Sequence, residues 1–249
     1  MAAHYQTDLA HVHHAGFSEY SARAGRWLLE ELARRGLTRG TVVDLGCGGG
    51  TFLELCARAG LDAVGVDQSQ ALATIARLTA PSAEVHVGSA HAFELPRCVA
   101  VTAFGEVLGY LAPAARKAPA LAPLFRRVAR ALEPGGVFLF DLLVEGAASL
   151  SGQRAVSTPS WTVLSTTSED RRACVLTRDI VTFVEEADGR YRRSQEQHRL
   201  AVHERGAVVE ALQSAGFVVR TLRAIGEQPM LPRRVAFFAR KPTRAAHPS

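Results

Sequence analysis

The sequence has only four cysteines, and no two of them (Cys47, Cys56, Cys98, Cys174) stand in C-x-x-C spacing. This scarcity argues against a disulfide framework and against the common zinc-binding patterns, so we expect reduced, mostly buried thiols. Long apolar runs are also missing, because none approaches the ~20 residues that span a bilayer. Residues 1–10 lack the basic-then-apolar pattern of a secretory signal. These absences predict a cytoplasmic protein with no membrane partner.

A broad basic surface is missing as well, although the net charge is +5. The segment 206–249 carries seven basic and two acidic side chains, so it alone accounts for the whole excess. A nucleic-acid-binding face is more often a wider basic patch with interleaved aromatic residues. We therefore interpret this segment as a solvated basic terminus and expect no nucleic acid partner.

Glycine is abundant at one place, the stretch 41–59. An apolar strand, Thr41–Val43, leads into Asp44, four glycines follow within positions 46–50, and apolar residues then recur at helical spacing. Glycine allows sharp turns and a close approach of the backbone to a ligand. Free N–H groups at a helix N-terminus suit a polar or anionic ligand. The stretch therefore predicts a nucleotide-type ligand across the end of a parallel sheet.

The fingerprint of dinucleotide-binding proteins does not fit this turn, because its third glycine is replaced by Thr51 or, in the other register, by Leu53. Asp67 ends the next expected strand, about 20 residues after the turn, where a carboxylate can accept hydrogen bonds from ribose hydroxyls. The run Asp44-Leu45-Gly46-Cys47-Gly48-Gly49-Gly50 resembles the first motif of class I S-adenosylmethionine-dependent methyltransferases. In that family the glycine turn holds the methionine part of the cofactor.

Further stretches support this resemblance. The strand 98–104 and the residues Gly105–Leu111 resemble the fourth motif of the family, which borders the transferred methyl group. Ser89 stands where the family often has an acidic residue that reaches adenine, so its hydroxyl or backbone would make that contact. The resemblance implies S-adenosylmethionine as the cofactor. The implied cofactor contacts are Asp44, Gly46, Cys47, Gly48, Gly50, Asp67, Gln68, Ser89, Ala90, Phe104 and Gly105.

The expected fold is α/β and Rossmann-like. It has a seven-stranded, mostly parallel sheet with helices on both faces, an antiparallel C-terminal hairpin and an inserted antiparallel β cap. We divide the chain into an N-terminal lid and helix (1–40), a core (41–145 and 206–242), a substrate cap (146–205) and a disordered tail (243–249). Within the cap, 146–160 is predicted to be loop. The strands 161–167, 174–185 and 191–202 are polar on both alternating sets, which predicts an exposed sheet.

Three residues are candidate catalytic groups. Glu106 follows the fourth strand, where it could orient an amine, remove a proton or only fix the turn. His13 of the lid and His198 of the cap are the other candidate bases, because the ordinary pKa of histidine suits proton transfer near neutral pH. Candidate substrate contacts are Tyr5, His14, Tyr20, Tyr110 and Arg199. The spacing of His11, His13 and His14 does not bring them to one helix face, so we predict no metal site.

The interpretation is a methyltransferase that moves a methyl group to an oxygen or nitrogen of a small-molecule acceptor by in-line SN2 transfer, with a role in specialised metabolism. Such a reaction needs little covalent help, because positioning can supply most of the acceleration. The alternatives are a nicotinamide-dependent oxidoreductase and a non-catalytic cofactor-binding or RNA-associated protein. A homodimer is left open.

Overall fold

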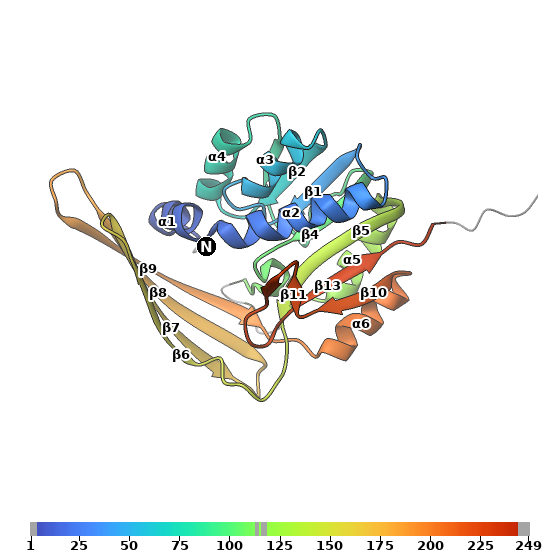
Figure 1. Ribbon diagram of the computed structural model, residues 1–249. Coiled ribbons are helices and arrows are strands. Elements are labelled where there is room, and N and C mark those ends of the chain that lie inside the picture. Colours follow the sequence, from blue (N-terminus) through green and yellow to red (C-terminus); the bar gives the residue numbers. More distant parts are fainter. Residues whose placement is uncertain (1–3, 113–114, 116–118, 244–249) are drawn as a thin grey trace, which may run out of the picture.

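The computed structural model describes residues 4–112, 115 and 119–243 (Figure 1). Of the tail predicted to be disordered, 244–249 lies outside these residues. The helices are α1 (Thr7–Phe17), α2 (Glu19–Arg34), α3 (Thr51–Arg58), α4 (Gln70–Thr79), α5 (Leu121–Ala131) and α6 (Arg205–Ser214), with a short 3-10 helix η1 (Val107–Gly109). Within the described residues, every helix is too short or too polar to span a lipid bilayer.

The central sheet has seven strands in the order β10-β13-β5-β4-β1-β2-β3. These strands are β1 (Thr41–Leu45), β2 (Asp62–Asp67), β3 (Glu84–Val87), β4 (Cys98–Ala103), β5 (Leu132–Leu143), β10 (Val218–Leu222) and β13 (Arg234–Arg240). Within this sheet, β13 runs in the direction opposite to the other six strands. The predicted Rossmann-like sheet with a C-terminal antiparallel hairpin is therefore confirmed. Strand order reverses between β1 and β4, the place where such sheets bind ligands.

Helices cover both faces of the central sheet, because successive residues of each strand point to opposite sides. On β5, Phe138 and Phe140 pack with the apolar residues of α5 and α6, while Val137 and Leu139 pack with those of α2 and α3. All four side chains are fully buried. A strand buried on both faces reads as a continuous apolar run, and residues 137–140 form such a run.

A separate four-stranded antiparallel sheet, β6-β7-β8-β9, projects from the central sheet beneath α1 (Figure 1). Its strands are β6 (Gly152–Ser157), β7 (Trp161–Asp170), β8 (Val175–Glu185) and β9 (Tyr191–Ala201). The chain leaves and re-enters the core at adjacent points. Val144 and His203 form a parallel bridge, and the Glu145 N–H donates to the His203 carbonyl oxygen at 2.9 Å.

The loop predicted for 146–160 is wrong in part, because β6 lies within it. This strand pairs with β7 through six residue pairs and is exposed at nearly every position. Backbone pairing to an adjacent strand is enough to hold such an edge, and it needs no apolar pattern. The loop between β10 and β13 likewise contains a small hairpin, β11 (Ala224–Ile225) with β12 (Gln228–Pro229).

The prediction that the inserted sheet is exposed is wrong for its inner face. Trp161, Val163 and Ile180 are each less than a tenth exposed. They pack against Leu9 and Val12 of α1, the helix that contains the histidines of the predicted lid. The sequence pattern predicts no helix there, so it offers no partner for this face.

Candidate functional site

The glycine turn joins β1 to α3 and closes around the end of β2. The N–H groups of Gly46 and Cys47 both donate to the Val66 carbonyl oxygen, at 2.7 and 3.1 Å. Gly46, Gly48 and Gly50 have φ of 76°, 54° and 82°, the left-handed region that favours glycine. A Cβ on Gly50 would lie 2.9 Å from the Ala76 Cα atom. Glycine is therefore required at position 50 by both backbone conformation and space.

Asp67 is held beside this turn by backbone donors. Its Oδ2 accepts from the Gly48 N–H at 2.9 Å, and its Oδ1 accepts from the Ser69 N–H at 2.8 Å. Burial raises the pKa of this carboxyl, while the hydrogen bonds from the Ser69, Gly48 and Gln68 backbone oppose the rise. Each carboxylate oxygen keeps a further lone pair, so Asp67 can still accept hydrogen bonds from a ligand diol.

Asp67 lines a small cavity of about 50 Å³. The other lining residues are His4, Tyr5, Gly46, Val66, Gln68, Ser69, Gly88, Ala90, Val107 and Tyr110. The polar groups of this cavity, the Asp67 carboxylate among them, suit the nucleoside part of the implied cofactor. The volume of the cavity does not, because 50 Å³ holds about one or two waters. His4 and Tyr5 of the N-terminal segment help to enclose this space.

Four of the predicted cofactor residues, Gly46, Asp67, Gln68 and Ala90, line the small cavity. Asp44 does not line it. Its Oδ1 accepts a hydrogen bond from the Thr102 hydroxyl at 2.6 Å, which ties β1 to β4, and burial raises its pKa to about 6. Asp44 thus stands behind the turn rather than at the ligand surface.

The remaining predicted cofactor residues lie around these. Cys47, Gly48 and Gly50 form the turn itself. The Ser89 Oγ accepts from the His91 N–H at 3.2 Å and so stabilises the turn after β3. Phe104 packs edge-on against Phe52, with ring centroids 5.4 Å apart. Gly105 lies at a second, larger cavity described next.

The large cavity has a volume of about 690 Å³ and lies between the central sheet, α1 and the inner face of β6–β9. Small-molecule sites commonly enclose ~300–1,000 Å³. Its polar lining residues are Tyr5, His13, Tyr20, Glu106, Tyr110, Gln153, Arg154, Ser165, Thr167, Arg178, Gln228 and Arg234; its apolar ones are Leu9, Phe17, Gly105, Leu150, Gly152, Val156, Val163, Ile180, Pro229, Met230 and Leu231. Residues from four separate stretches of the chain (5–20, 105–110, 150–180 and 228–234) therefore meet around one space.

Glu106 presents its carboxylate to the large cavity from a left-handed backbone conformation, with φ of 61°. Its Oε2 accepts from the Arg178 Nη2 at 2.8 Å, and its Oε1 lies 3.9 Å from the Arg234 Nε. Both guanidinium groups stabilise the ionised carboxylate. Oε1 is beyond hydrogen-bond distance of Arg234, so it retains acceptor capacity toward the cavity.

Asp141, at the end of β5, fixes the turn that presents Glu106. The fully buried carboxylate accepts from the backbone N–H groups of Gly105 and Glu106, each at 2.9 Å. It also accepts from the Arg234 Nε at 2.6 Å and the Tyr20 hydroxyl at 3.1 Å. Asp141 is not among the site residues predicted from the sequence. The usable signal was an acidic residue near the carboxyl end of a parallel strand, the edge of the sheet where such folds bind ligands.

Arg178 and Arg234 were missed for a different reason. Arg178 comes from the inserted sheet and Arg234 from the basic terminus, which the charge count indicates to be solvated. That interpretation is wrong for Arg233 and Arg234, whose side chains are 6% and 11% exposed. Buried carboxylates hold both: Arg233 pairs with Glu169 at 2.7 Å and Arg234 with Asp141 at 2.6 Å.

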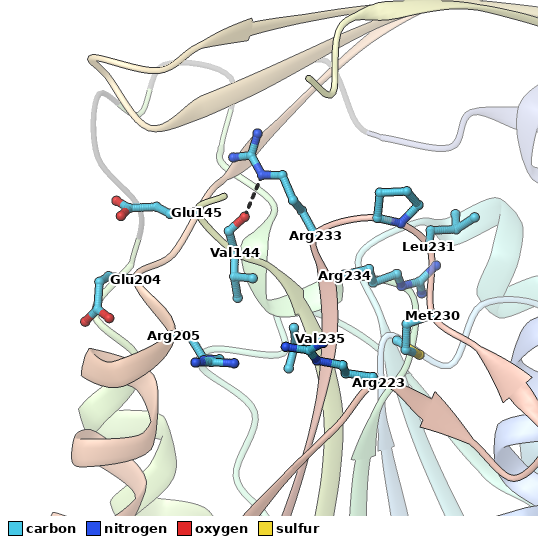
Figure 2. A pocket seen from close by; sticks show the side chains of 11 residues that line it. Val144, Glu145, Glu204, Arg205, Arg223, Met230, Leu231, Arg233, Arg234 and Val235 are labelled. Atoms are coloured by element: carbon cyan, nitrogen blue, oxygen red, sulfur yellow. Dashed lines mark hydrogen bonds between the residues drawn. The ribbon is translucent and has the colours of Figure 1, made fainter. Parts of the chain in front are cut away.

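Figure 2 shows these two neighbours at a further cavity of about 540 Å³. Arg233 turns toward Val144, whose carbonyl oxygen accepts from its Nε at 2.9 Å. Arg234 points the other way, past Met230 and Leu231. Arg234 and the segment Met230–Leu231 thus separate this cavity from the large one, because they line both.

The predicted base His13 lines the large cavity, one turn from Phe17. Its pKa is lowered to about 4, chiefly by burial and to a lesser degree by the neighbouring His14 and His198. His13 is therefore a neutral imidazole near pH 7. His14 lies elsewhere: its ring fills the space beside Gly49, where a Cβ would overlap it.

His198 is 1% exposed and does not line the large cavity. Its Nε2 lies 2.9 Å from the Glu196 Oε2, and the rings of His4, Tyr5 and Tyr110 cover it. Arg199 lies on the opposite face of β9, and its Nη1 donates to the Ala115 carbonyl oxygen at 2.9 Å. Neither residue touches the cavity in this arrangement, because alternation along the strand separates Arg199 and ring packing encloses His198.

Tyr5, Tyr20 and Tyr110, predicted to contact substrate, all line the large cavity. The hydroxyls of Tyr5 and Tyr110 lie 2.9 Å apart. Tyr20 lies under the Arg234 guanidinium, whose central carbon is 4.0 Å from the ring centroid. Two of the three phenols therefore stand at the boundary with the small cavity, and the third supports the arginine.

Residues 42–136 match the family model of a methyltransferase domain. A putative methyltransferase of Geobacillus sp. (strain WCH70) is 26% identical over 231 residues, covering 86% of this chain and 88% of its own. Among solved structures, an S-adenosylmethionine-dependent methyltransferase of Clostridium acetobutylicum has a TM-score of 0.77 at 16% identity, with 94% and 97% of the two chains covered. The sugar N-methyltransferase KedS8 of a Streptoalloteichus species has a TM-score of 0.76 at 22% identity, covering 97% and 96%. The two structural similarities establish the fold.

Proposed function

Because the chain is a class I S-adenosylmethionine-dependent methyltransferase, we propose that it methylates an amine nitrogen of a small-molecule acceptor bound in the large cavity. The observation that carries this proposal is the Glu106 carboxylate, which faces the cavity directly after Gly105. A carboxylate with a free acceptor oxygen can hold an amine N–H and so direct the nitrogen lone pair. The volume of about 690 Å³ suits a sugar-sized acceptor. The similarity to a sugar N-methyltransferase supports the same class of acceptor.

The cofactor, when bound, supplies a methyl group already activated by a positively charged sulfur. The glycine turn, Asp67 and Gln68 would hold it. The protein's own task is then to orient a neutral amine and to exclude water. Glu106 Oε1 would accept an acceptor N–H, while Asp141 keeps the Gly105–Glu106 turn in place.

A hydroxyl acceptor would need a group that removes its proton. The pKa of His13 is lowered to about 4, so His13 is a weak base for an alcohol, and the Glu106 Oε2 is already held by the Arg178 Nη2. An amine needs no such group, because its neutral form carries the lone pair that attacks. This difference favours nitrogen over oxygen as the methylated atom.

Separate roles for the core, the inserted sheet and the N-terminal segment are also part of this proposal. The core would bind the cofactor, the sheet β6–β9 would supply one wall of the acceptor site, and the segment 4–17 would act as the lid. A role in specialised metabolism, a cytoplasmic location and a homodimer stay predictions from the sequence.

The test is a panel of amino sugars and their hydroxyl counterparts, incubated with the enzyme and methyl-labelled cofactor. We expect methyl transfer to nitrogen, identified by mass spectrometry together with release of S-adenosylhomocysteine. Glu106→Gln should lower kcat/KM by about 100-fold, the size of effect expected when the attacking group is misplaced. Glu94→Gln, an exposed glutamate on the same domain, is the matched control. Methylation confined to hydroxyl analogues would contradict the nitrogen assignment.

A further inference from the structure

Glu196 of β9 caps the start of α1 from a distance of about 190 residues along the chain. Its Oε2 accepts from the Tyr5 N–H at 2.7 Å, and its Oε1 accepts from the Gln6 N–H at 2.8 Å. The helix itself supplies no side-chain cap at its N-terminus. A carboxylate at this end satisfies unpaired N–H groups and complements the helix dipole. The inserted sheet therefore fastens the first turn of the N-terminal segment.

A second ion pair fastens the same helix to the same strand. Arg192 of β9 donates to both carboxylate oxygens of Asp8, with a closest distance of 2.7 Å. This guanidinium lowers the pKa of the Asp8 carboxyl. The Arg192 side chain is half exposed, whereas Glu196 is buried. The contact made by Glu196 is therefore the more rigid of the two.

Tyr5 connects this fastening to the core. Its carbonyl oxygen accepts from the Ser69 Oγ at 2.6 Å, and its hydroxyl lies 2.9 Å from that of Tyr110. Its backbone has φ of 55°, an uncommon conformation for a tyrosine. Such a conformation persists only where the surroundings hold it. Here the surroundings are Glu196 on one side and Ser69 on the other.

The position of Tyr5 matters because it lines both the small and the large cavity. Tyr110 is the other residue that lines both. Methyl transfer requires the cofactor in the small cavity to meet the acceptor in the large one. The Tyr5–Tyr110 pair therefore lies between the two reactants. His4 and Tyr5 also form part of the wall of the small cavity, so a cofactor bound there acts directly on the segment that Glu196 holds.

We propose that Glu196 is a positioning residue, which couples the cofactor site to the acceptor site by holding Tyr5 at their shared boundary. Glu196 lines neither cavity in this arrangement and acts through the backbone of Tyr5 and Gln6. His198 supports it by bonding to Oε2 at 2.9 Å. The proposal rests on the methyl-transfer function above but requires no particular acceptor.

Trp161 is a built-in reporter of this coupling. It packs with Leu9 and Val12 of α1, and a Cβ on Gly16 would lie 2.7 Å from its Cη2 atom. The sequence has one other tryptophan, Trp27, which packs on Phe238 of the central sheet. In a Trp27→Phe background, emission therefore reports on α1 against the inserted sheet alone.

The experiment compares the Trp27→Phe protein with and without Glu196→Gln. We expect saturating S-adenosylhomocysteine to shift Trp161 emission in the parent, and Glu196→Gln to abolish most of that shift. With any acceptor the parent uses, kcat should fall about 10-fold or more while the acceptor KM changes less, because misplacement of a wall residue affects alignment first. Glu185→Gln, an exposed glutamate of the same sheet, is the matched control and should behave like the parent.

Arg192→Gln is the second variant, in case Glu196→Gln does not fold; it should reduce the emission shift partially. An emission shift of parental size in Glu196→Gln, with kcat unchanged, would overturn the proposal. So would the absence of any shift in the parent at a ligand concentration where calorimetry detects binding. The fluorescence arm needs no acceptor, so it stands or falls independently of whether the acceptor is an amine.

Discussion

The two sheets of this protein are stabilised in different ways. The central sheet is buried on both faces by the helices that connect its strands and by α2, which directly precedes β1, so β5 holds a run of fully buried residues. The sheet β6–β9 leaves one face in water, and its other face is covered by α1, which lies about 150 residues earlier in the chain. The first sheet is completed by its own connections, whereas the second depends on a distant segment.

Polar side chains show the same contrast. In the core, the carboxylate of Asp141 is fully buried and accepts four hydrogen bonds. On the outer face of the inserted sheet, Asp179 accepts one bond from the Gln197 side chain at 2.9 Å. A polar group of the core is therefore held by several buried hydrogen bonds, while a polar group of the outer face can be substituted with little loss of stability. Three sets of substitutions test this contrast.

The largest effect is expected for Asp141→Asn. The amide places an N–H group against existing donors and removes the closer of the two counter-ions of the buried Arg234, which costs about 3–5 kcal/mol of unfolding free energy. Asp179→Asn, the matched change in the inserted sheet, should cost less than about 0.5 kcal/mol. Urea denaturation of both variants measures the two values. Equal losses would show that the two regions do not differ as described.

A smaller difference is expected between two glycines with the same backbone requirement. Gly50 and Gly189 have φ of 82° and 79°. A Cβ on Gly189, in the β8–β9 hairpin, would point into open space, whereas a Cβ on Gly50 would meet the Ala76 backbone. Gly189→Ala should cost about 1 kcal/mol for the left-handed conformation, and Gly50→Ala about 2–4 kcal/mol. Thermal denaturation distinguishes them, and a smaller loss at Gly50 would contradict the packing argument.

The smallest effect is a pH dependence at the boundary between the two regions. Burial lowers the pKa of His13 from 6.5 to about 4, so in that interval the unfolded chain binds a proton that the folded one does not. Stability should therefore fall as pH decreases from 6.5 to about 4. His13→Gln should reduce this slope by at most about 1.4 kcal/mol per pH unit, the value for one proton. Denaturation at about pH 8, above both pKa values, is the reference, and an unchanged slope would contradict the assignment.

The parts that sequence reasoning could predict are those where one local pattern determines the structure. The turn at Gly46–Gly50 and the apolar run 137–140 carry their requirements in consecutive residues. The position of Asp67 followed from the length of one strand–helix–strand unit. These features predicted the central sheet and, through the family resemblance, the methyltransferase.

The parts that could not be predicted depend on contacts between distant segments. The strand β6 is polar and pairs only because β7 lies beside it. Arg178 and Arg234 reach Glu106 from positions 72 and 128 residues away, and no spacing rule connects them. The burial of His198 follows from the packing of His4, Tyr5 and Tyr110, which alternation within β9 cannot reveal.

The bridge between Val144 and His203 has a consequence for how such a protein can diversify. Since the inserted sheet begins and ends at neighbouring points of the core, its length and shape place no strain on the strands that hold the glycine turn. A replacement of the inserted sheet must still cover Leu9 and Val12, so the sheet and α1 have to change together. It must also provide partners for Glu106 and Arg233, which now pair with Arg178 and Glu169. Under the proposed function, acceptor preference can therefore change through two stretches of the chain while the strands of the central sheet keep their arrangement.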